Sequence, residues 1–146
     1  MQYNYNHIFL ENRQISNTSA IRWSCFTAMV IGIAWIFTLF HIISVPALAF
    51  QIIAPVSIFI LLLPAVVNHL MHLSDILLVG SKGINLLTGL ILGCNLTAVF
   101  LLSSTLSHYA SIIWLLPTLI ACQYYSKRIT SHIFWGGLAG MILSFY

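Results

Sequence analysis

Three polar residues on one short segment have the types and spacing of metal ligands. His69, His72 and Asp75 occupy positions i, i+3 and i+6, and on a continuous helix their side chains would fall within an arc of about 120°. Transition metals need three or four such ligands, held by supporting hydrogen bonds. A metal site formed by these three residues is therefore one hypothesis. The alternative is a polar loop whose imidazoles lie at a membrane–water interface.

A second histidine pair, His41 and His108, is suited to a different cofactor. A b-type haem takes two axial ligands, which must come from different helices at one depth in the membrane. The spans predicted below place His41 and His108 near the same membrane face. Haem ligation by this pair is the second cofactor hypothesis, although no four-helix haem pattern accompanies it.

Catalytic groups are scarce, which argues against an enzyme. Glu11 and Asp75 are the two acidic residues, and the sequence has no GxSxG, P-loop, HExxH or GxGxxG motif. Residues 23–67 and 84–125 contain no Asp, Glu, Lys or Arg, whereas ion-coupled transporters and voltage sensors usually carry such groups within the membrane. We therefore predict a non-enzymatic protein, and we disfavour an ion-coupled pump acting alone.

Two glycine pairs have the spacing of helix-contact motifs. Gly89 with Gly93, and Gly136 with Gly140, form GxxxG patterns, in which the missing side chains let two helix backbones approach closely. Such a pattern predicts either association with another chain or contact between two helices of the same chain. The sequence does not choose between these two interpretations.

Two amide side chains, Gln51 and Asn95, lie within strongly apolar segments. An amide without a hydrogen-bond partner in hydrocarbon costs on the order of a few kcal/mol, so each should find a partner on a neighbouring helix. The favoured interpretation is hydrogen bonding between helices. The alternative is that they line a polar path for a small neutral solute.

The elements that must position these residues are long apolar segments. Of 146 residues, 60% are hydrophobic and 5% are charged, whereas an ordinary soluble domain is about one quarter charged. A hydrocarbon core of about 30 Å needs roughly 20 apolar residues in a helix. The sequence predicts an all-α, polytopic transmembrane helical bundle with four spans and a short fifth apolar segment, at about residues 23–45, 47–67, 84–102, 109–125 and 133–146.

The predicted spans also give a domain division and an orientation. Residues 1–22 are predicted to be a polar cytoplasmic tail, and residues 23–146 a single transmembrane domain, although segment 133–146 is marginally short for a full crossing. The basic residues all fall on one side of the alternating spans, which is the positive-inside pattern of a cytoplasmic N-terminus. They are Arg13, Arg22, Lys82, Lys127 and Arg128. The short spans suit a bacterial inner membrane.

Three functional hypotheses follow from these patterns. The leading one is a non-enzymatic helical subunit of a larger membrane complex, which associates with other subunits or with itself in the lipid bilayer. The alternatives are a small homo-oligomeric channel or facilitator for a neutral solute, and a haem- or metal-binding membrane subunit. The basic residues are too few and too scattered to predict a nucleic-acid surface.

Overall fold

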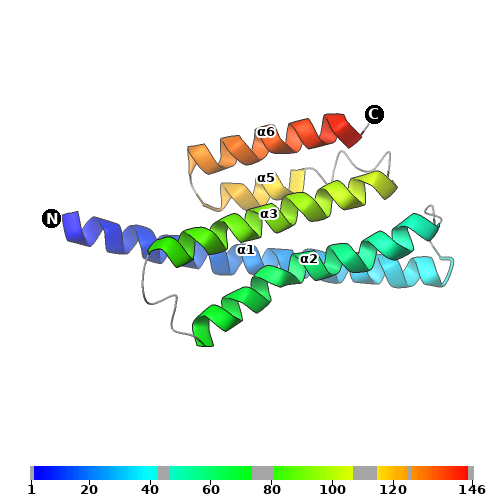
Figure 1. Cartoon of the computed structure of the whole chain (residues 1–146), viewed down its shortest axis with the longest axis horizontal. Helices are drawn as coiled ribbons and strands as arrows, with labels where there is room; N and C mark the ends of the chain where they lie inside the picture. Colours follow the sequence, from blue (N-terminus) through cyan, green and yellow to red (C-terminus); the bar gives the residue numbers. More distant parts are fainter. Residues whose placement is uncertain (1, 43–46, 74–80, 107–114, 125, 145–146) are drawn as a thin grey trace.

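Helices that run along the long axis of the molecule make up its fold (Figure 1). The computed structural model describes residues 2–42, 47–73, 81–106, 115–124 and 126–144. The helices within these ranges are α1 (Gln2–Leu39), α2 (Ala47–Leu73), α3 (Ser81–Leu106), α5 (Leu115–Cys122) and α6 (Lys127–Ser144). α3 packs against α1 and α2, and the α5–α6 pair packs on the side of α3 away from α2.

Three of the described helices are long and apolar enough to cross a membrane. They contain the candidate spans Leu10–Leu39, Leu48–Leu73 and Lys82–Thr105. The all-α class is confirmed, but the expected four spans are wrong for the described chain, which has three. α5 has 8 residues, or roughly 12 Å of helix against a hydrocarbon core of about 30 Å. Residues 109–114 of the expected fourth span lie outside the described residues.

α6 begins earlier than the sequence predicted. It starts at Lys127, not near residue 133, because Ser126 occupies the N-cap position, where a hydroxyl satisfies a free backbone N–H. Ser126 Oγ accepts a long hydrogen bond from the Ile129 N–H at 3.5 Å, and the Ser126 carbonyl accepts from the Thr130 N–H at 3.0 Å. The added residues 127–132 are mostly polar, and α6 is not among the candidate spans.

α1 is one continuous helix of 38 residues, so part of the polar N-terminal segment belongs to the same helix as the first span. The helix stops at Leu39, short of the predicted boundary at residue 45. His41 has a φ of 55°, the Ile42 N–H donates to the Phe37 carbonyl at 2.9 Å, and the His41 N–H donates to the Thr38 carbonyl at 3.1 Å. These bonds form a Schellman motif, which satisfies the last carbonyls and ends the helix.

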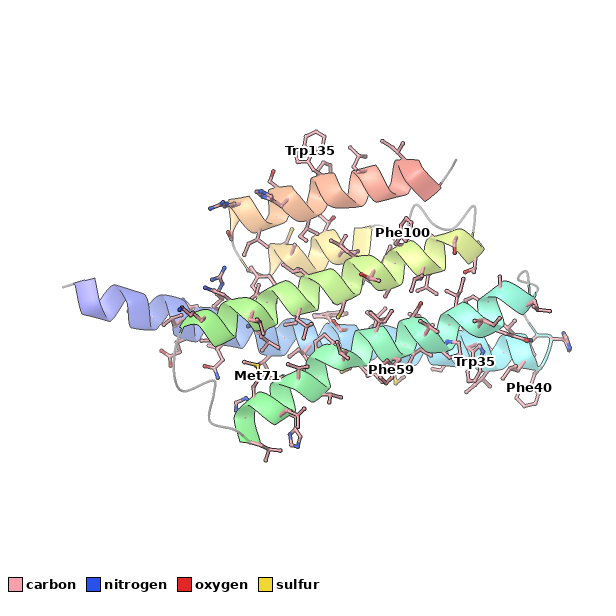
Figure 2. The ribbon with its side chains drawn as sticks, viewed as in Figure 1. Trp35, Phe40, Phe59, Met71, Phe100 and Trp135 are labelled. Atoms are coloured by element: carbon pink, nitrogen blue, oxygen red, sulfur yellow. The ribbon has the colours of Figure 1, made fainter. Side chains whose placement is uncertain are left out.

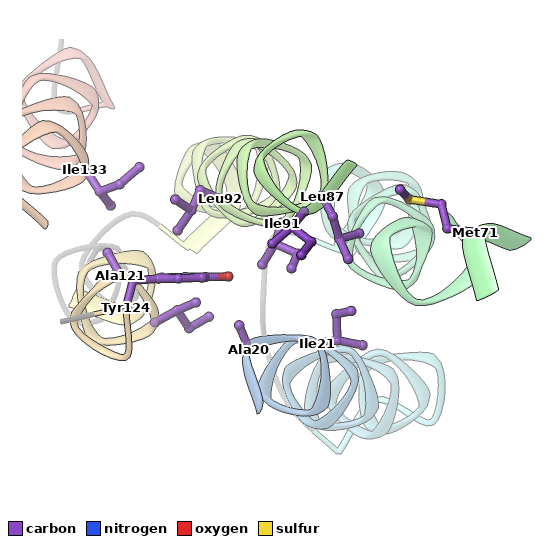
Figure 3. Close-up of a cluster of buried hydrophobic side chains, with 11 residues drawn as sticks. Ala20, Ile21, Met71, Leu87, Ile91, Leu92, Ala121, Tyr124 and Ile133 are labelled. Atoms are coloured by element: carbon purple, nitrogen blue, oxygen red, sulfur yellow. The ribbon is translucent and has the colours of Figure 1, made fainter. Parts of the chain in front are cut away.

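The buried apolar side chains form two main clusters around α3. One cluster joins α1, α3 and the α5–α6 pair, with Met71 of α2 at one side, and includes Ala20, Leu87 and Ile91 (Figure 3). The other joins α1, α2 and α3 through small side chains such as Ala28, Ala54 and Ala98. Small residues at these positions let the three long helices approach closely, as in other membrane bundles.

The outer surface of the bundle is apolar. Phe59 is 71% exposed and Trp135 is 62% exposed, and Figure 2 shows Trp135 pointing away from the other helices. In water, an apolar surface of this extent would promote association, whereas lipid tails cover it in a bilayer. Together with the three candidate spans, this surface indicates a multi-pass membrane protein.

Candidate functional site

Two hydrogen-bonded polar layers join α1 to α3. Asn95 Nδ2 donates to Ser24 Oγ at 2.8 Å, and both side chains are fully buried. In the second layer, Asn17 Nδ2 donates to the Ile84 carbonyl at 3.2 Å, and the Thr88 hydroxyl donates to Asn17 Oδ1 at 3.0 Å. The sequence analysis gave hydrogen bonding between helices as one interpretation of Asn95, and the hydrogen bond to Ser24 is consistent with it.

The spacing of the two layers fixes how α1 and α3 lie against each other. Asn17 pairs with Thr88, and Ser24 pairs with Asn95, so both pairs have a sequence separation of 71. The layers are one heptad apart on each helix, which is the repeat of side chains facing a partner in left-handed helix packing. A shift of one helix along the other by a single turn would break both sets of hydrogen bonds.

Several buried polar atoms keep unused hydrogen-bonding capacity within the described residues. Asn95 Oδ1 and Ser57 Oγ are buried and accept or donate no hydrogen bond there, and the Tyr124 hydroxyl is in the same condition. The Tyr124 ring extends from the turn after α5 toward the space between α1 and α3, close to Ala20 and Ile91 (Figure 3). Buried polar atoms in native proteins commonly pair with an ordered water molecule.

A third group of polar contacts closes the end of the bundle where α3 begins. Arg13 donates to Asn85 Oδ1, and Ser16 Oγ donates to the Gln123 carbonyl at 3.1 Å in the turn between α5 and α6. Burial raises the pKa of Tyr124, and the Arg13 guanidinium partly offsets this shift. The Tyr124 hydroxyl therefore stays protonated at neutral pH and remains a hydrogen-bond donor.

The two glycine motifs differ in their surroundings. Gly89 and Gly93 are exposed, and a Cβ atom added to either would meet nothing within 4 Å. In α6, Gly136 is open in the same way, but its motif partner Gly140 is buried within the chain. The α3 pair therefore lies on an unpacked face of this chain, whereas the α6 pair is divided between an outer and an inner face.

The histidines of the haem hypothesis cannot be compared as a pair. His41 is exposed and holds the left-handed position that ends α1, so its backbone has a structural role that the sequence did not indicate. His108 lies outside the described residues. Ligation of haem by His41 and His108 therefore stays a prediction.

The metal hypothesis is likewise untested. His69 and His72 are both exposed on the last turns of α2, and Asp75 lies outside the described residues. Among the residues that the structure describes, no group of three or more His, Cys, Asp or Glu side chains could hold a metal ion. The spacing of these three residues remains the basis of the prediction.

Gln51 and Asn95 do not lie in one hydrogen-bonded group. Gln51 is half-buried in the first turns of α2, whereas the Asn95 amide bonds to Ser24 and to the Ile91 carbonyl of its own helix. Within the described ranges, no hydrogen bond connects Gln51 to Asn95. A polar path would therefore continue from Asn95 through groups other than Gln51.

The sequence analysis missed three residues of the polar layers between α1 and α3. Asn17 was assigned to a tail, and Ser24 and Thr88 were given no role. A signal was present, since polar residues at 17 and 24 and at 88 and 95 repeat with a spacing of seven. Two segments with matched polar residues at heptad spacing favour mutual packing.

Comparison of the chain with protein-family models, with curated proteins and with solved structures found no match.

Proposed function

We propose that the chain is a non-enzymatic helical membrane protein that works by associating with another transmembrane helix through the outer face of α3. The observation that carries this proposal is the open glycine face, at Gly89 and Gly93. Thr97 extends the same exposed face by one turn. Small residues spaced four apart on a lipid-exposed helix face favour close backbone contact with a second helix.

Larger apolar side chains border this glycine face at both ends. Leu86 is 66% exposed and Phe100 is 49% exposed, so a partner helix lying along α3 would contact a shallow groove between two projecting side chains. Packing of this kind in a membrane depends on shape more than on hydrophobicity, because lipid tails are as apolar as leucine. A subunit of a larger complex or a second copy of the chain would satisfy the same contact.

The association is tested by native mass spectrometry of protein extracted gently from the membrane in which it is expressed. The wild-type chain should appear in a complex, and the double variant Gly89→Leu/Gly93→Leu should appear as a monomer, because the added side chains hold a partner backbone away. Gly136→Leu on α6 is the control, since it adds a leucine side chain at another open glycine.

Three outcomes decide the proposal. Loss of the complex in the α3 double variant, with the Gly136→Leu complex intact, supports association through the α3 face. A wild-type chain that is monomeric under mild extraction contradicts the proposal. Equal loss of the complex in the double variant and the control would also contradict it, because the effect would then not depend on the α3 face.

The cytoplasmic N-terminus and the bacterial inner membrane are part of the same proposal. The orientation agrees with the polar contacts at one end of the bundle, where Arg13 on α1, Asn85 on α3 and the turn before α6 meet, whereas the bacterial inner membrane rests on the sequence pattern alone. Arg13 contacts Asn85, and Lys82 lies one turn before Asn85 at the start of α3, so two basic residues from separate parts of the sequence lie toward this end, in agreement with the positive-inside pattern. Labelling of an introduced cysteine at residue 2 from the cytoplasmic side alone would test the orientation.

A specific observation also supports the second candidate function, a channel or facilitator for a small neutral solute. Asn95 Oδ1 and Ser57 Oγ are buried polar atoms without a described partner, and polar groups in the interior of a membrane bundle mark solute pathways in many transporters. Asn95→Leu should then lower solute flux into liposomes. The matched control is Ser104→Ala, which removes an exposed hydroxyl from the same helix outside the glycine face. Unchanged flux in the Asn95 variant would exclude this path.

A further inference from the structure

A groove on the exposed face of α1 contains an arginine next to two aromatic rings. Ser19, Arg22, Trp23 and Phe26 line a shallow depression of about 350 Å³ that is open to the surface. Their positions are i, i+3, i+4 and i+7, so they share one face of the helix. The groove therefore presents a hydroxyl, a cation and an apolar wall in sequence along the helix axis.

The position of Arg22 along α1 places this groove near a membrane surface. Leu39, the last residue of α1, lies 17 residues after Arg22, which is about 26 Å at the helical rise of 1.5 Å per residue. A hydrocarbon core is about 30 Å thick. If the Leu39 end of the span is at one surface, the Arg22 backbone is about 4 Å inside the opposite boundary of the hydrocarbon core, and its long side chain can extend outward to the lipid headgroups. Ser19 lies further out and Phe26 further in.

Arg22 is available to a ligand in a way that Arg13 is not. Arg13 donates a hydrogen bond to Asn85, whereas Arg22 has no hydrogen bond or ion pair with any residue that the structure describes. A guanidinium group presents several N–H donors in a fixed fork, which matches the oxygens of a phosphate. The Ser19 hydroxyl, one turn away on the same face, is a second donor.

The aromatic side of the groove has the form of an apolar wall. The Trp23 and Phe26 rings meet edge to face, with centroids 5.9 Å apart and an angle of 87° between the ring planes. Each ring is 52% exposed. Tryptophan favours the headgroup level of a bilayer, and Phe26 lies one turn deeper than Arg22, where an acyl chain leaves its headgroup.

We propose that this groove binds an anionic phospholipid. Arg22 and Ser19 hold the phosphate oxygens, and the first part of an acyl chain lies along Trp23 and Phe26. The gradient from polar to apolar residues selects a membrane lipid over a soluble phosphate, because a soluble ion would leave the aromatic wall without a contact. The net negative charge of the lipid matters because Arg22 attracts the headgroup as a whole. This inference uses a different helix from the α3 association face and does not depend on it.

The test is native mass spectrometry of the full-length protein in neutral detergent, titrated separately with phosphatidylglycerol and phosphatidylcholine. Wild-type protein should bind phosphatidylglycerol several-fold more tightly than phosphatidylcholine. Arg22→Gln should weaken binding of phosphatidylglycerol roughly fivefold, the effect of about one surface cation on an anionic lipid. Arg22→Lys should retain part of the preference, because it keeps the charge but loses the fork.

The matched control is Arg128→Gln, which removes an exposed cation from α6 and should leave the lipid preference unchanged. Equal weakening by Arg22→Gln and Arg128→Gln would overturn the proposal, because the attraction would then be non-specific. Equal affinity of the wild-type protein for the two lipids would also overturn it. Inorganic phosphate at millimolar concentration distinguishes the two sources of the phosphate group. Failure to displace the lipid supports a lipid site, and complete displacement means that the groove recognises phosphate alone and overturns the lipid assignment.

Discussion

Both faces of α3 carry large apolar side chains, but these side chains have very different surroundings. On the inner face, Leu87 is 1% exposed and Asn95 is fully buried against α1. On the outer face, Leu86 is 66% exposed, and a Cβ atom added at Gly93 would have no neighbour within 4 Å. In a bilayer, apolarity therefore does not identify the core of a protein. The placement of hydrogen-bonding and very small residues separates the face that holds the bundle together from the face that is open to lipid or a partner.

The largest expected difference between the two faces comes from two adjacent leucines. Leu87→Ala removes a fully packed side chain and should lower the free energy of unfolding by roughly 2–5 kcal/mol. Leu86→Ala on the outer face should change it by no more than about 0.5 kcal/mol, because lipid covers the site in both forms. Steric trapping in bicelles measures both values on the full chain.

Two results for the leucine variants would contradict the proposed difference between the inner and outer faces of α3. Equal destabilisation by Leu86→Ala and Leu87→Ala would show that the outer face of α3 contributes to the fold of the single chain. A negligible effect of Leu87→Ala would show that the cluster around Leu87 and Ile91 does not hold α3 in place.

A smaller effect is expected from the polar layer of the inner face. A double-mutant cycle with Asn95→Leu and Ser24→Ala should give a coupling energy of about 0.6 kcal/mol, the average for hydrogen bonds between membrane helices, and no more than about 1.7 kcal/mol. The cycle is needed because Asn95→Leu also removes Oδ1, a buried atom without a described partner, and this change alone should favour folding. Additive effects of the two substitutions would mean that the contact does not stabilise the bundle.

The smallest effect on folding is expected at the glycines of the outer face. Gly89→Ala and Gly93→Ala should each leave the free energy of unfolding of the monomer within about 0.5 kcal/mol of wild type, because the added methyl groups meet no atom of this chain. The same unfolding assay, run at a dilution where the chain is monomeric, measures this change. A marked loss of monomer stability would place these glycines in a contact within the chain and would remove the basis of the association proposal.

Much of the fold could be predicted from the sequence, because long apolar segments can satisfy their backbone in a membrane only as helices or closed barrels. The helical class and the three long helices follow from this constraint. The starts and ends of helices were harder to place, since single residues decide them. Ser126 starts α6 among polar residues, and His41 ends α1 through a left-handed conformation that side chains other than glycine rarely adopt.

The candidate sites were less predictable than the fold. Asn95 was identified because a buried amide must find a partner, but its partner Ser24 could not be chosen from several small polar residues without the helix register. The openness of Gly89 and Gly93 depends on which face of α3 the other helices cover, and a GxxxG pattern carries no information about that. The Arg22 groove is lined by Ser19, Arg22, Trp23 and Phe26. These residues come together only because the helix continues through positions 19–26 and places them on one face.

The hydrogen bonds within α1 and α3 have a consequence for how the protein enters the membrane during synthesis. Ser24 Oγ donates to the Ala20 carbonyl at 3.0 Å, and the Asn95 amide donates to the Ile91 carbonyl at 2.8 Å. Each polar side chain thus has a partner on its own helix before the other helix has been made. α1 can therefore insert into the bilayer before α2 and α3 have been translated. The pairing of Ser24 with Asn95 can then take place as a separate step of assembly.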